Sequence, residues 1–331
     1  MTTIPESRRV IEIRQFGGPD TLQAATEKMP RLEAGKVLVA IGAVGVNFAD
    51  TMVRRGEYRK DQQLPCVPGL EAAGRVVAVG PGTSMAIGTR VAAFLESGGA
   101  YSDYAAISED LLFPIEVDLP DDVVAASFLQ GVTAWYCVHR YGRVAADDAV
   151  LVSGASGGLG TWAVQLASAS GATVVGLAST ADKRAHALRL GCTEAFDPGS
   201  PDLTAQLRNI TKSGFDVIID GVGGPLFERL MPALAKNGHY IVAGSATQRP
   251  AMLDTRHLLP RGQSITGFVV RNVMDMDANE PQAALTECLH HIAAGRVTVD
   301  ITTMGMSDAA KAHALLEERH VAGKLVLDPR Y

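Results

Sequence analysis

The residues with the clearest chemical potential in this chain are the glycines of residues 150–160, VLVSGASGGLG. They follow an apolar run and precede a helix-like run, TWAVQLASASGA, so a tight turn between a strand and a helix is expected. Such a turn lets the backbone approach a pyrophosphate, to which the helix N-terminus offers unpaired N–H groups. Against the pattern G-x-G-x-x-G, Ala155 takes the place of the first glycine. The turn predicts a dinucleotide site that comprises Ser156, Gly157, Gly158, Leu159 and Gly160.

The next strand-like segment, residues 173–180 (TVVGLAST), completes a β-α-β unit of about 30 residues. An NAD-selective unit usually carries Asp or Glu at the end of this strand, where it binds the ribose hydroxyls. Ser179 and Thr180 stand here instead, with Lys183 close behind. Hydroxyls beside a cation suit the 2′-phosphate of NADP, and Asp182 is interpreted as a first-turn acid of the next helix. We expect NADPH rather than NADH, the alternative for Lys183 being a solvated helix face.

The same glycine-rich turn also matches a different catalytic pattern. Gly154-Ala155-Ser156-Gly157-Gly158 fits G-x-S-x-G, the nucleophile elbow of serine hydrolases. Asp220 with His239 or His257 could complete a triad in the required chain order. No HGG-like turn precedes the elbow to supply oxyanion donors, and the third glycine would have no role, so the dinucleotide interpretation is preferred.

The elements around this turn predict two domains, since 331 residues are many for one core. The first ~125 residues carry short β-like runs punctuated by Gly and Pro, typical of an antiparallel or barrel-like domain. After residue 180, strand and helix patterns alternate, which predicts an α/β fold with a doubly wound parallel sheet of about six strands. The expected strands are 37–46, 72–80, 89–95, 215–220, 239–244 and 264–270, and the expected helices are 181–190 and 225–236. The tail, residues 281–331, is expected to fold back onto the first domain.

Composition excludes several classes of partner. A formal charge of −6 without a basic run argues against nucleic acid. No apolar segment reaches the roughly 18 residues of a membrane span, and the start lacks a continuous apolar region, so a soluble cytoplasmic protein is expected. The four cysteines form no C-x-x-C and indicate neither a disulfide framework nor a zinc site.

Several motifs together resemble one known family. Asp147-Asp148-x-x-Leu151, Ala155-Ser156-Gly157-Gly158-x-Gly160 and Gln165-x-x-Ser168 are similar to the quinone oxidoreductase and zeta-crystallin signature. GVNFADTMVRRGEY, PGLEAAGRVVAVGPG, DGVGG and the terminal GKLVL extend the resemblance over nearly the whole chain, to the medium-chain dehydrogenase/reductase superfamily. It implies a GroES-like catalytic domain at 1–126 and 271–331, and a Rossmann NADP-binding domain at 127–270. It also implies a homodimer, which would use the last Rossmann strand near residues 268–270.

The superfamily also includes zinc alcohol dehydrogenases, so the residues at the zinc-ligand positions decide whether a metal is expected. Asn47 stands where the zinc branch has a ligand Cys, and Gly69-Leu70-Glu71 replaces Gly-His-Glu. Residues 97–104, where a structural zinc site would lie, contain no cysteine. Tetrahedral zinc needs three or four N, S or O ligands, so we expect no zinc.

What the resemblance implies for the active site is a pair of polar residues, Asn47 and Tyr58. The alternative for Asn47 is a helix N-cap with Asp50, and for Tyr58 a loop aromatic. Further residues near the cofactor are implied at Thr133, Gly244, Ser245, Phe268, Val269 and Lys324. Family members with firm NADPH preference often carry Tyr where this chain has Phe196-Asp197-Pro198, which bears on cofactor selectivity.

The expected activity is NADPH-dependent, zinc-free reduction of a small quinone or α,β-unsaturated carbonyl by hydride transfer. The alternative is an NADPH-binding sensor or crystallin-like protein with little catalysis.

Overall fold

The computed structural model describes residues 4–274 and 279–331, in two compact units. Unit 1 comprises Met1–Leu129, Ala278–Ala293 and Val299–Tyr331, and unit 2 comprises Gln130–Asp277 and Ala294–Thr298. The GroES-like segment predicted at 271–331 includes residues 275–278, which lie outside the described residues. No helix in the described parts is long and apolar enough to cross a membrane.

Unit 1 is built on a mostly antiparallel sheet. Its strand order in the described residues is β14-β15-β3-β4-β5-β7, and β6 also pairs with β3. The strands are β3 (Lys36–Val46), β4 (Glu71–Val79), β5 (Arg90–Phe94), β6 (Tyr104–Ser108), β7 (Leu112–Pro114), β14 (Ile301–Gly305) and β15 (Lys324–Asp328). A separate pair, β1 (Ser7–Ile13) and β2 (Leu22–Lys28), is antiparallel. The predicted strands 37–46, 72–80 and 89–95 are confirmed, whereas β1, β2, β6, β7, β14 and β15 were not predicted as strands.

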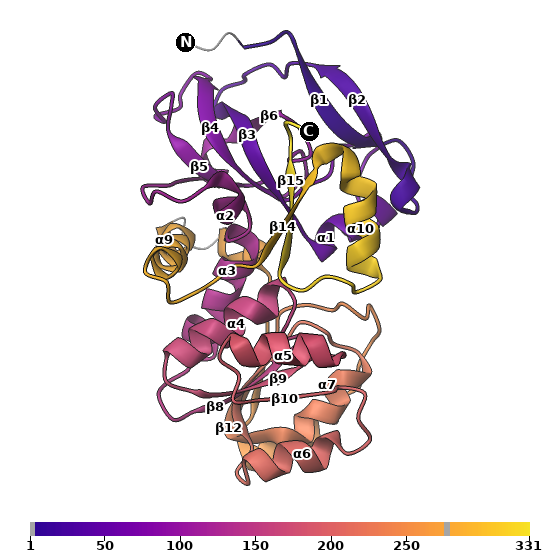
Figure 1. Ribbon diagram of the computed structural model, residues 1–331, viewed down its shortest axis with the longest axis vertical. Coiled ribbons are helices and arrows are strands. Elements are labelled where there is room, and N and C mark those ends of the chain that lie inside the picture. Colours follow the sequence, from indigo (N-terminus) through magenta and orange to yellow (C-terminus); the bar gives the residue numbers. More distant parts are fainter. Residues whose placement is uncertain (1–3, 275–278) are drawn as a thin grey trace. The chain divides into compact units, whose positions relative to one another are not determined.

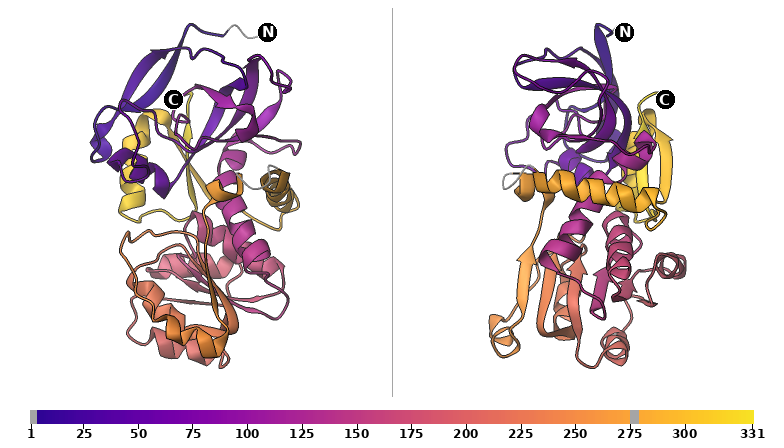
Figure 2. Two further views of the ribbon diagram at one scale, coloured as in Figure 1. Left: turned by 180° about the vertical axis from the view of Figure 1, so that it is seen from behind. Right: turned by 90° about the vertical axis from the view of Figure 1, so that its left-hand side faces the viewer.

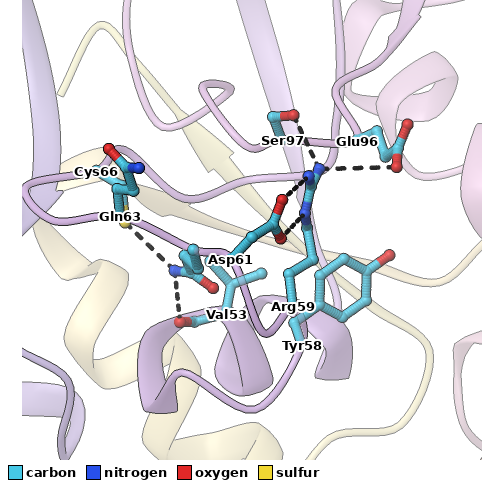
Figure 3. A pocket seen from close by; sticks show the side chains of 9 residues that line it. Val53, Tyr58, Arg59, Asp61, Gln63, Cys66, Glu96 and Ser97 are labelled. Carbon is cyan, nitrogen blue, oxygen red and sulfur yellow. Dashed lines mark hydrogen bonds and ion pairs between the residues drawn. The ribbon is translucent and has the colours of Figure 1, made fainter.

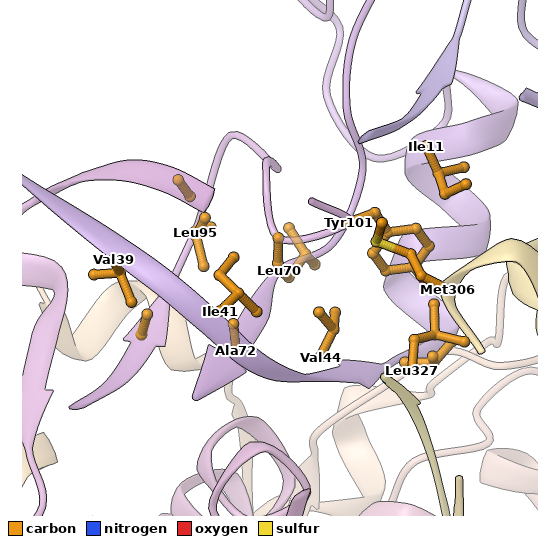
Figure 4. Close-up of a cluster of buried hydrophobic side chains, with 14 of the residues drawn as sticks. Ile11, Val39, Ile41, Val44, Leu70, Ala72, Leu95, Tyr101, Met306 and Leu327 are labelled. Atoms are coloured by element: carbon orange, nitrogen blue, oxygen red, sulfur yellow. The ribbon is translucent and has the colours of Figure 1, made fainter. Parts of the chain in front are cut away.

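The C-terminal segment closes this sheet, as the sequence predicts. β15, one of the yellow C-terminal strands in Figure 2, pairs antiparallel with β3. In this pairing Leu325 lies opposite Val46. Strand β3 reads KVLVAIGAVGV and is buried along most of its length, which is typical of a strand covered on both faces. Its side chains form one apolar cluster with those of β4, β15 and the segment that follows β14 (Figure 4). The members of this cluster that Figure 4 labels are Ile11, Val39, Ile41, Val44, Leu70, Ala72, Leu95, Tyr101, Met306 and Leu327.

Short helices connect or cover the strands of unit 1. They are α1 (Phe48–Arg55), α2 (Asp121–Ala125), α9 (Asn279–Ala293) and α10 (Ala309–Glu317). Helix α1 begins after Asn47 and ends at Gly56, whose φ of 73° places it in the left-handed region that glycine adopts readily. Asn47 therefore lies at the N-cap position, as its alternative role predicts.

Unit 2 contains a parallel sheet with the strand order β10-β9-β8-β11-β12-β13 in its described residues. The strands are β8 (Ala149–Ser153), β9 (Thr173–Leu177), β10 (Glu194–Phe196), β11 (Phe215–Asp220), β12 (Leu234–Val242) and β13 (Ser264–Gly267). This is the order 3-2-1-4-5-6 of doubly wound dinucleotide-binding sheets, in which the carboxyl ends of strands 1 and 4 flank the ligand crevice. The predicted α/β fold class is confirmed.

Helices connect these strands and cover the sheet. They are α3 (Phe128–Trp135), which begins in unit 1, α4 (Gly158–Ala169), α5 (Ala181–Arg189), α6 (Leu203–Ile210), α7 (Pro225–Leu230) and α8 (Val270–Met274). Figure 1 shows α5 and α6 on opposite sides of the sheet, as expected when right-handed crossovers reverse direction between β10 and β11.

Several predicted boundaries in unit 2 are wrong. The helix predicted at 225–236 ends at Leu230, because Pro232 lies in a 3₁₀ turn and strand β12 already begins at Leu234. The strand predicted at 264–270 ends at Gly267, and Val270 begins helix α8. Residues 268–270 therefore follow the last strand of the sheet and do not form it.

Candidate active site

A buried polar network lies where three strands of unit 1 meet. Asn47 directly follows β3, Glu71 begins β4 and Lys324 begins β15. The Lys324 Nζ donates to Asn47 Oδ1 at 2.7 Å and also to Glu71 Oε1. Asn47 Nδ2 donates to the same Glu71 oxygen at 2.8 Å, and the other Glu71 oxygen accepts from the Leu129 N–H at 2.7 Å. All three side chains are almost fully buried, with at most 3% of each residue exposed.

Strand register brings these residues together. Glu71 pairs with Gly45 on one side of β3, and on its other side Leu325 pairs with Val46. A β-carbon on Gly45 would lie 2.3 Å from Glu71 Oε1, so glycine is required for the carboxylate to cross the strand. The ends of β4 and β15 thus deliver opposite charges to the same end of β3.

Asp50 ties this network to helix α1. Its Oδ2 accepts the Asn47 N–H at 2.8 Å, and its N–H donates to the Asn47 carbonyl oxygen at 3.0 Å. The predicted helix-capping role of this pair is therefore confirmed. Burial raises the pKa of Asp50 to about 7, against the lowering effects of the Asn47 N–H and the Lys324 charge. The Asp50 carboxyl, which is fully buried beside the charged pair, therefore has a pKa near neutral pH.

The donors of this network fit zinc poorly. Zinc ligands are thiolates, neutral imidazoles and carboxylates, whereas Lys324 presents an ammonium, which has no lone pair to offer. That ammonium is already bound to Glu71 and Asn47, two of the side chains that a metal would need. Among the residues that the structure describes, no group of three or more His, Cys, Asp or Glu could hold a metal ion.

Tyr58 lines a pocket in the same unit. The pocket measures about 160 Å³ and is formed by the end of α1, by residues 58–66 and by residues 96–97 (Figure 3). Tyr58 is half-buried there, beside Arg59. The hydrogen bond and negative charge of Asp61 raise the pKa of the Arg59 guanidinium. Cys66 also lines the pocket, and its Sγ accepts from Gln62 Nε2 at 3.3 Å. Burial raises the pKa of the Cys66 thiol.

In unit 2, the predicted glycine turn connects β8 to α4. Gly154 has a φ of 60°, so the residue before the predicted Ala155 takes the left-handed conformation of the turn. Gly157 is the N-cap of α4 and lies half-buried. A β-carbon on Gly160 would lie 2.1 Å from the Gly154 carbonyl oxygen, so glycine is needed for the helix to pack against the turn. Ser156 is buried, whereas Gly158 and Leu159 are half-buried at the helix start.

Polar residues follow the next strand, β9, as predicted. Ser179 and Thr180 are exposed, and Thr180 Oγ1 accepts the Lys183 N–H at 3.3 Å as the N-cap of α5. Asp182 lies in the first turn of this helix, as interpreted from the sequence. No carboxylate stands at Ser179 or Thr180, the two positions directly before the helix.

A second buried network, which sequence reasoning missed, holds the loops after β8 and β11. Asp220 ends β11, and its two carboxylate oxygens accept from Ser153 Oγ at 2.5 Å and from the Tyr240 hydroxyl at 2.7 Å. The N–H groups of Val222 and Gly223 also bond to Asp220 Oδ1. An acidic residue at the carboxyl end of a predicted parallel strand was the available signal, because such ends line ligand crevices.

The other residues predicted to lie near the cofactor are found in different parts of the structure. Gly244 packs against Gly221, where an added β-carbon would lie 2.8 Å from a carbonyl oxygen, and Ser245 is exposed. Thr133 is half-buried in α3. Phe268 is buried and stacks on Tyr136 with ring centroids 5.2 Å apart. Val269 is 45% exposed. Lys324 belongs to unit 1, together with Asn47 and Tyr58.

The hydrolase alternative is not supported by this geometry. Asp220 is bound to Ser153 and Tyr240, and His239 Nδ1 bonds to the Ser264 hydroxyl at 2.7 Å. The other proposed base, His257, is mostly exposed and lies 4.0 Å from Asp254. The proposed acid and the two proposed bases thus each contact other residues.

Comparisons with known proteins agree with this architecture. A family model described as zinc-binding dehydrogenase matches residues 158–289, and one described as alcohol dehydrogenase GroES-like domain matches residues 33–117. The chain is 31% identical over 330 residues to quinone oxidoreductase 1 of Escherichia coli, covering 96% of this chain and 99% of that protein. It is 32% identical over 329 residues to a 2-haloacrylate reductase of Burkholderia, covering 96% and 98%.

Solved structures give the same result. The crystal structure of Escherichia coli quinone oxidoreductase complexed with NADPH superposes with a TM-score of 0.91 at 31% identity, covering 97% of this chain and all of that one. Unit 1 therefore has the predicted GroES-like fold and unit 2 the predicted Rossmann fold.

Proposed function

Since the chain belongs to the quinone oxidoreductase-like family of medium-chain dehydrogenases/reductases, we propose that it is a zinc-independent NADPH-dependent reductase of quinones or α,β-unsaturated carbonyls. The coarser activity, that of an oxidoreductase, is the one its relatives share by name. The observation that carries the proposal is the Lys324–Glu71–Asn47 network, in which an ammonium rather than a metal ion meets the buried carboxylate.

The cofactor would be held by unit 2. The turn of Gly154, Gly157 and Gly160 leaves room for a pyrophosphate at the N-terminus of α4, where N–H groups favour negative charge. Ser179, Thr180 and Lys183 offer two hydroxyls and a cation to a 2′-phosphate. When bound, NADPH supplies a hydride to the acceptor.

The chain's own contribution to the chemistry lies in hydrogen bonding. Tyr58 lines a pocket, and its phenol can donate a hydrogen bond to the acceptor oxygen as negative charge develops there. The Asn47 amide is oriented by Glu71 and Lys324, so we propose it as the second polar residue of the site. The other proposed cofactor contacts are those predicted from the sequence: Thr133, Ser156, Gly158, Leu159, Gly244, Ser245, Phe268, Val269 and Lys324.

We also propose a homodimer. Among the described residues β13 is the edge strand of the unit 2 sheet, with β12 on one side, and unpaired strand edges are often covered by a partner. Sedimentation velocity of the purified protein tests this, and a monomeric mass at all concentrations would contradict it.

The activity is tested by measuring the loss of NADPH absorbance in the presence of a benzoquinone, a naphthoquinone, an alkenal or a saturated ketone. We expect NADPH consumption with the quinones or the alkenal but not with the ketone, and no effect of a chelator. Tyr58→Phe should lower kcat/KM by about tenfold or more, whereas Tyr104→Phe, a control in β6, should not. Tight NADPH binding without turnover would favour the sensor function instead.

Cofactor selectivity is tested by a second variant. Lys183→Ala should weaken the preference for NADPH over NADH by about tenfold, because the cation facing the 2′-phosphate is lost. Lys212→Ala, an exposed lysine in the same unit, is the matched control. An unchanged preference would remove Lys183 from the proposed site.

A further inference from the structure

The pocket that Tyr58 lines carries more negative than positive side-chain charge. Arg59 is the cation among the residues that line it, and Asp61 and Glu96 are the anions. One positive and two negative side chains give a formal charge of −1. Tyr58 and the polar side chains of the lining add no formal charge at neutral pH.

The single cation is already engaged by both anions. Arg59 Nε and Nη2 donate to the two Asp61 oxygens at 3.0 and 2.9 Å, a bidentate ion pair. Its Nη1 donates to Ser97 Oγ at 3.1 Å and lies 3.7 Å from Glu96 Oε1 (Figure 3). An incoming anion would therefore have to compete with two carboxylates for one guanidinium.

Another lining residue adds an acceptor of hydrogen bonds. Gln62 Nε2 donates to the Val53 carbonyl oxygen at 2.8 Å and to Cys66 Sγ. Its Oε1 is buried and makes no hydrogen bond within the described residues. A partially negative oxygen suits a ligand that is neutral or carries an O–H or N–H donor, and disfavours a carboxylate.

We infer that this pocket selects uncharged acceptors over anionic ones. This inference rests on the proposed function, in that the pocket with Tyr58 receives the acceptor. It assigns to this chain neutral quinones, enals or enoate esters rather than compounds that carry a free carboxylate, such as the 2-haloacrylate for which a 32% identical relative is named. Because the charged groups are partly exposed, the expected effect of removing one charge is about three- to tenfold.

The catalytic test compares kcat/KM for methyl 2-chloroacrylate and for 2-chloroacrylate, with NADPH. Glu96→Gln should lower the preference for the ester about three- to tenfold, and Asp61→Asn should do so at least as strongly because it also releases Arg59. Arg59→Gln should change the preference in the opposite direction. Glu33→Gln, an exposed carboxylate of unit 1 outside the pocket, is the matched control. Equal preferences in all variants would overturn the inference.

A second test requires no turnover. Cys66 lines the pocket, whereas Cys137, Cys192 and Cys288 are buried. Iodoacetamide and iodoacetate are a neutral and an anionic reagent of nearly the same size, and both react with the same thiolate, so the raised pKa of Cys66 cancels in the ratio of their rates. Relative to a small free thiol, wild-type Cys66 should favour iodoacetamide by about three- to tenfold, and Glu96→Gln should reduce this preference.

These two tests separate the inference from the proposed function. If no acceptor is reduced, the proposed function fails, and the alkylation ratio still measures the selectivity of the pocket. A Cys66 ratio equal to that of the free thiol, or a Cys66 that the neutral reagent cannot reach, would overturn the inference even if quinones are reduced. Cys66→Ser confirms that the label is on this residue.

Discussion

At the residue scale, the stability of the buried network depends most on Lys324, because its ammonium neutralises the Glu71 carboxylate, which has no access to solvent. Lys324→Met removes the ammonium and leaves Glu71 buried without its counter-ion. We expect the free energy of unfolding to fall by about 3–5 kcal/mol, measured by urea denaturation at pH 7. Lys28→Met, at an exposed position of β2, should change it by less than about 0.5 kcal/mol.

The double variant Lys324→Met/Glu71→Gln distinguishes an ion pair from simple packing. Once the carboxylate is gone, the loss of the ammonium leaves no buried charge, so the double variant should be more stable than the sum of the single effects predicts. Additive effects would show that the two side chains do not act as a pair.

Asp50 should make stability depend on pH in a definite direction. Its pKa is raised from 3.8 to about 7, so between these values the folded state keeps a proton that the unfolded state has released. The stabilising contribution is therefore complete below pH 3.8 and is lost as pH rises through 7. Relative to Asp50→Asn, the wild type should lose on the order of 3–4 kcal/mol between pH 4 and pH 8.

Urea denaturation across this pH range checks the Asp50 prediction, with Asp118→Asn as an exposed control. A difference between wild type and Asp50→Asn that stays constant with pH would mean that the carboxyl ionises normally in the folded protein. The wild-type curve alone is insufficient, since every carboxyl and histidine contributes to it.

Contacts between site residues that are close in the sequence were more predictable than contacts between residues far apart in the sequence. The cap between Asn47 and Asp50 was readable because three positions separate them, and helix capping depends on local spacing. Lys324 was predicted near the cofactor from resemblance, yet its observed partners are 253 and 277 positions away. Strand register creates that contact, and a single sequence does not specify the register of β15 beside β3.

At the element scale, the β8–α4 connection depends on two glycines for different reasons. An added methyl group at Gly160 would meet the Gly154 carbonyl oxygen at 2.1 Å, whereas at Gly157 it would meet the same oxygen at an ordinary 3.4 Å. Gly160→Ala should displace helix α4, lower stability by about 1–3 kcal/mol and weaken NADPH binding. Gly157→Ala should leave stability within about 0.5 kcal/mol of wild type, and weaken binding through its methyl group at the pyrophosphate.

Thermal unfolding and fluorescence titration with NADPH check this pair of variants. If Gly157→Ala binds NADPH as the wild type does, the backbone at that glycine does not approach the cofactor. If Gly160→Ala is as stable as the wild type, the helix can shift without cost, and the close approach has no structural importance.

Elements were predicted well where the pattern of apolar residues is long and uninterrupted. The central strands β3 and β8 are mostly continuous apolar runs, which is typical of buried strands. The end of helix 225–236 was placed too late, since residues 234–236 already lie on the long strand β12. The strand at 264–270 was placed too long because the apolar residues Phe268 to Val270 read as strand although they lie beyond it.

At the scale of the whole molecule, each unit has a core of its own. One cluster of buried apolar side chains lies in unit 1 around β3 and β15, and another lies in unit 2 around β11 and β12. The chain crosses between the units more than once, since unit 1 takes residues from both ends of the sequence. Unit 1 is therefore complete only when β15 has paired with β3.

This organisation predicts where NADPH should stabilise the protein. Because the proposed cofactor contacts lie mainly in unit 2, amide hydrogen exchange should slow most at residues 153–160, 178–184 and 220–224 when NADPH is added. At a concentration of 100 times Kd, the linkage adds about 2.7 kcal/mol to the free energy of unfolding. Residues of β1 and β2, which form a two-stranded sheet of unit 1, provide the internal control and should exchange at unchanged rates if they open locally. Slowing that is uniform over both units would indicate that they open only together, and slowing that spares residues 153–160 would place the cofactor elsewhere.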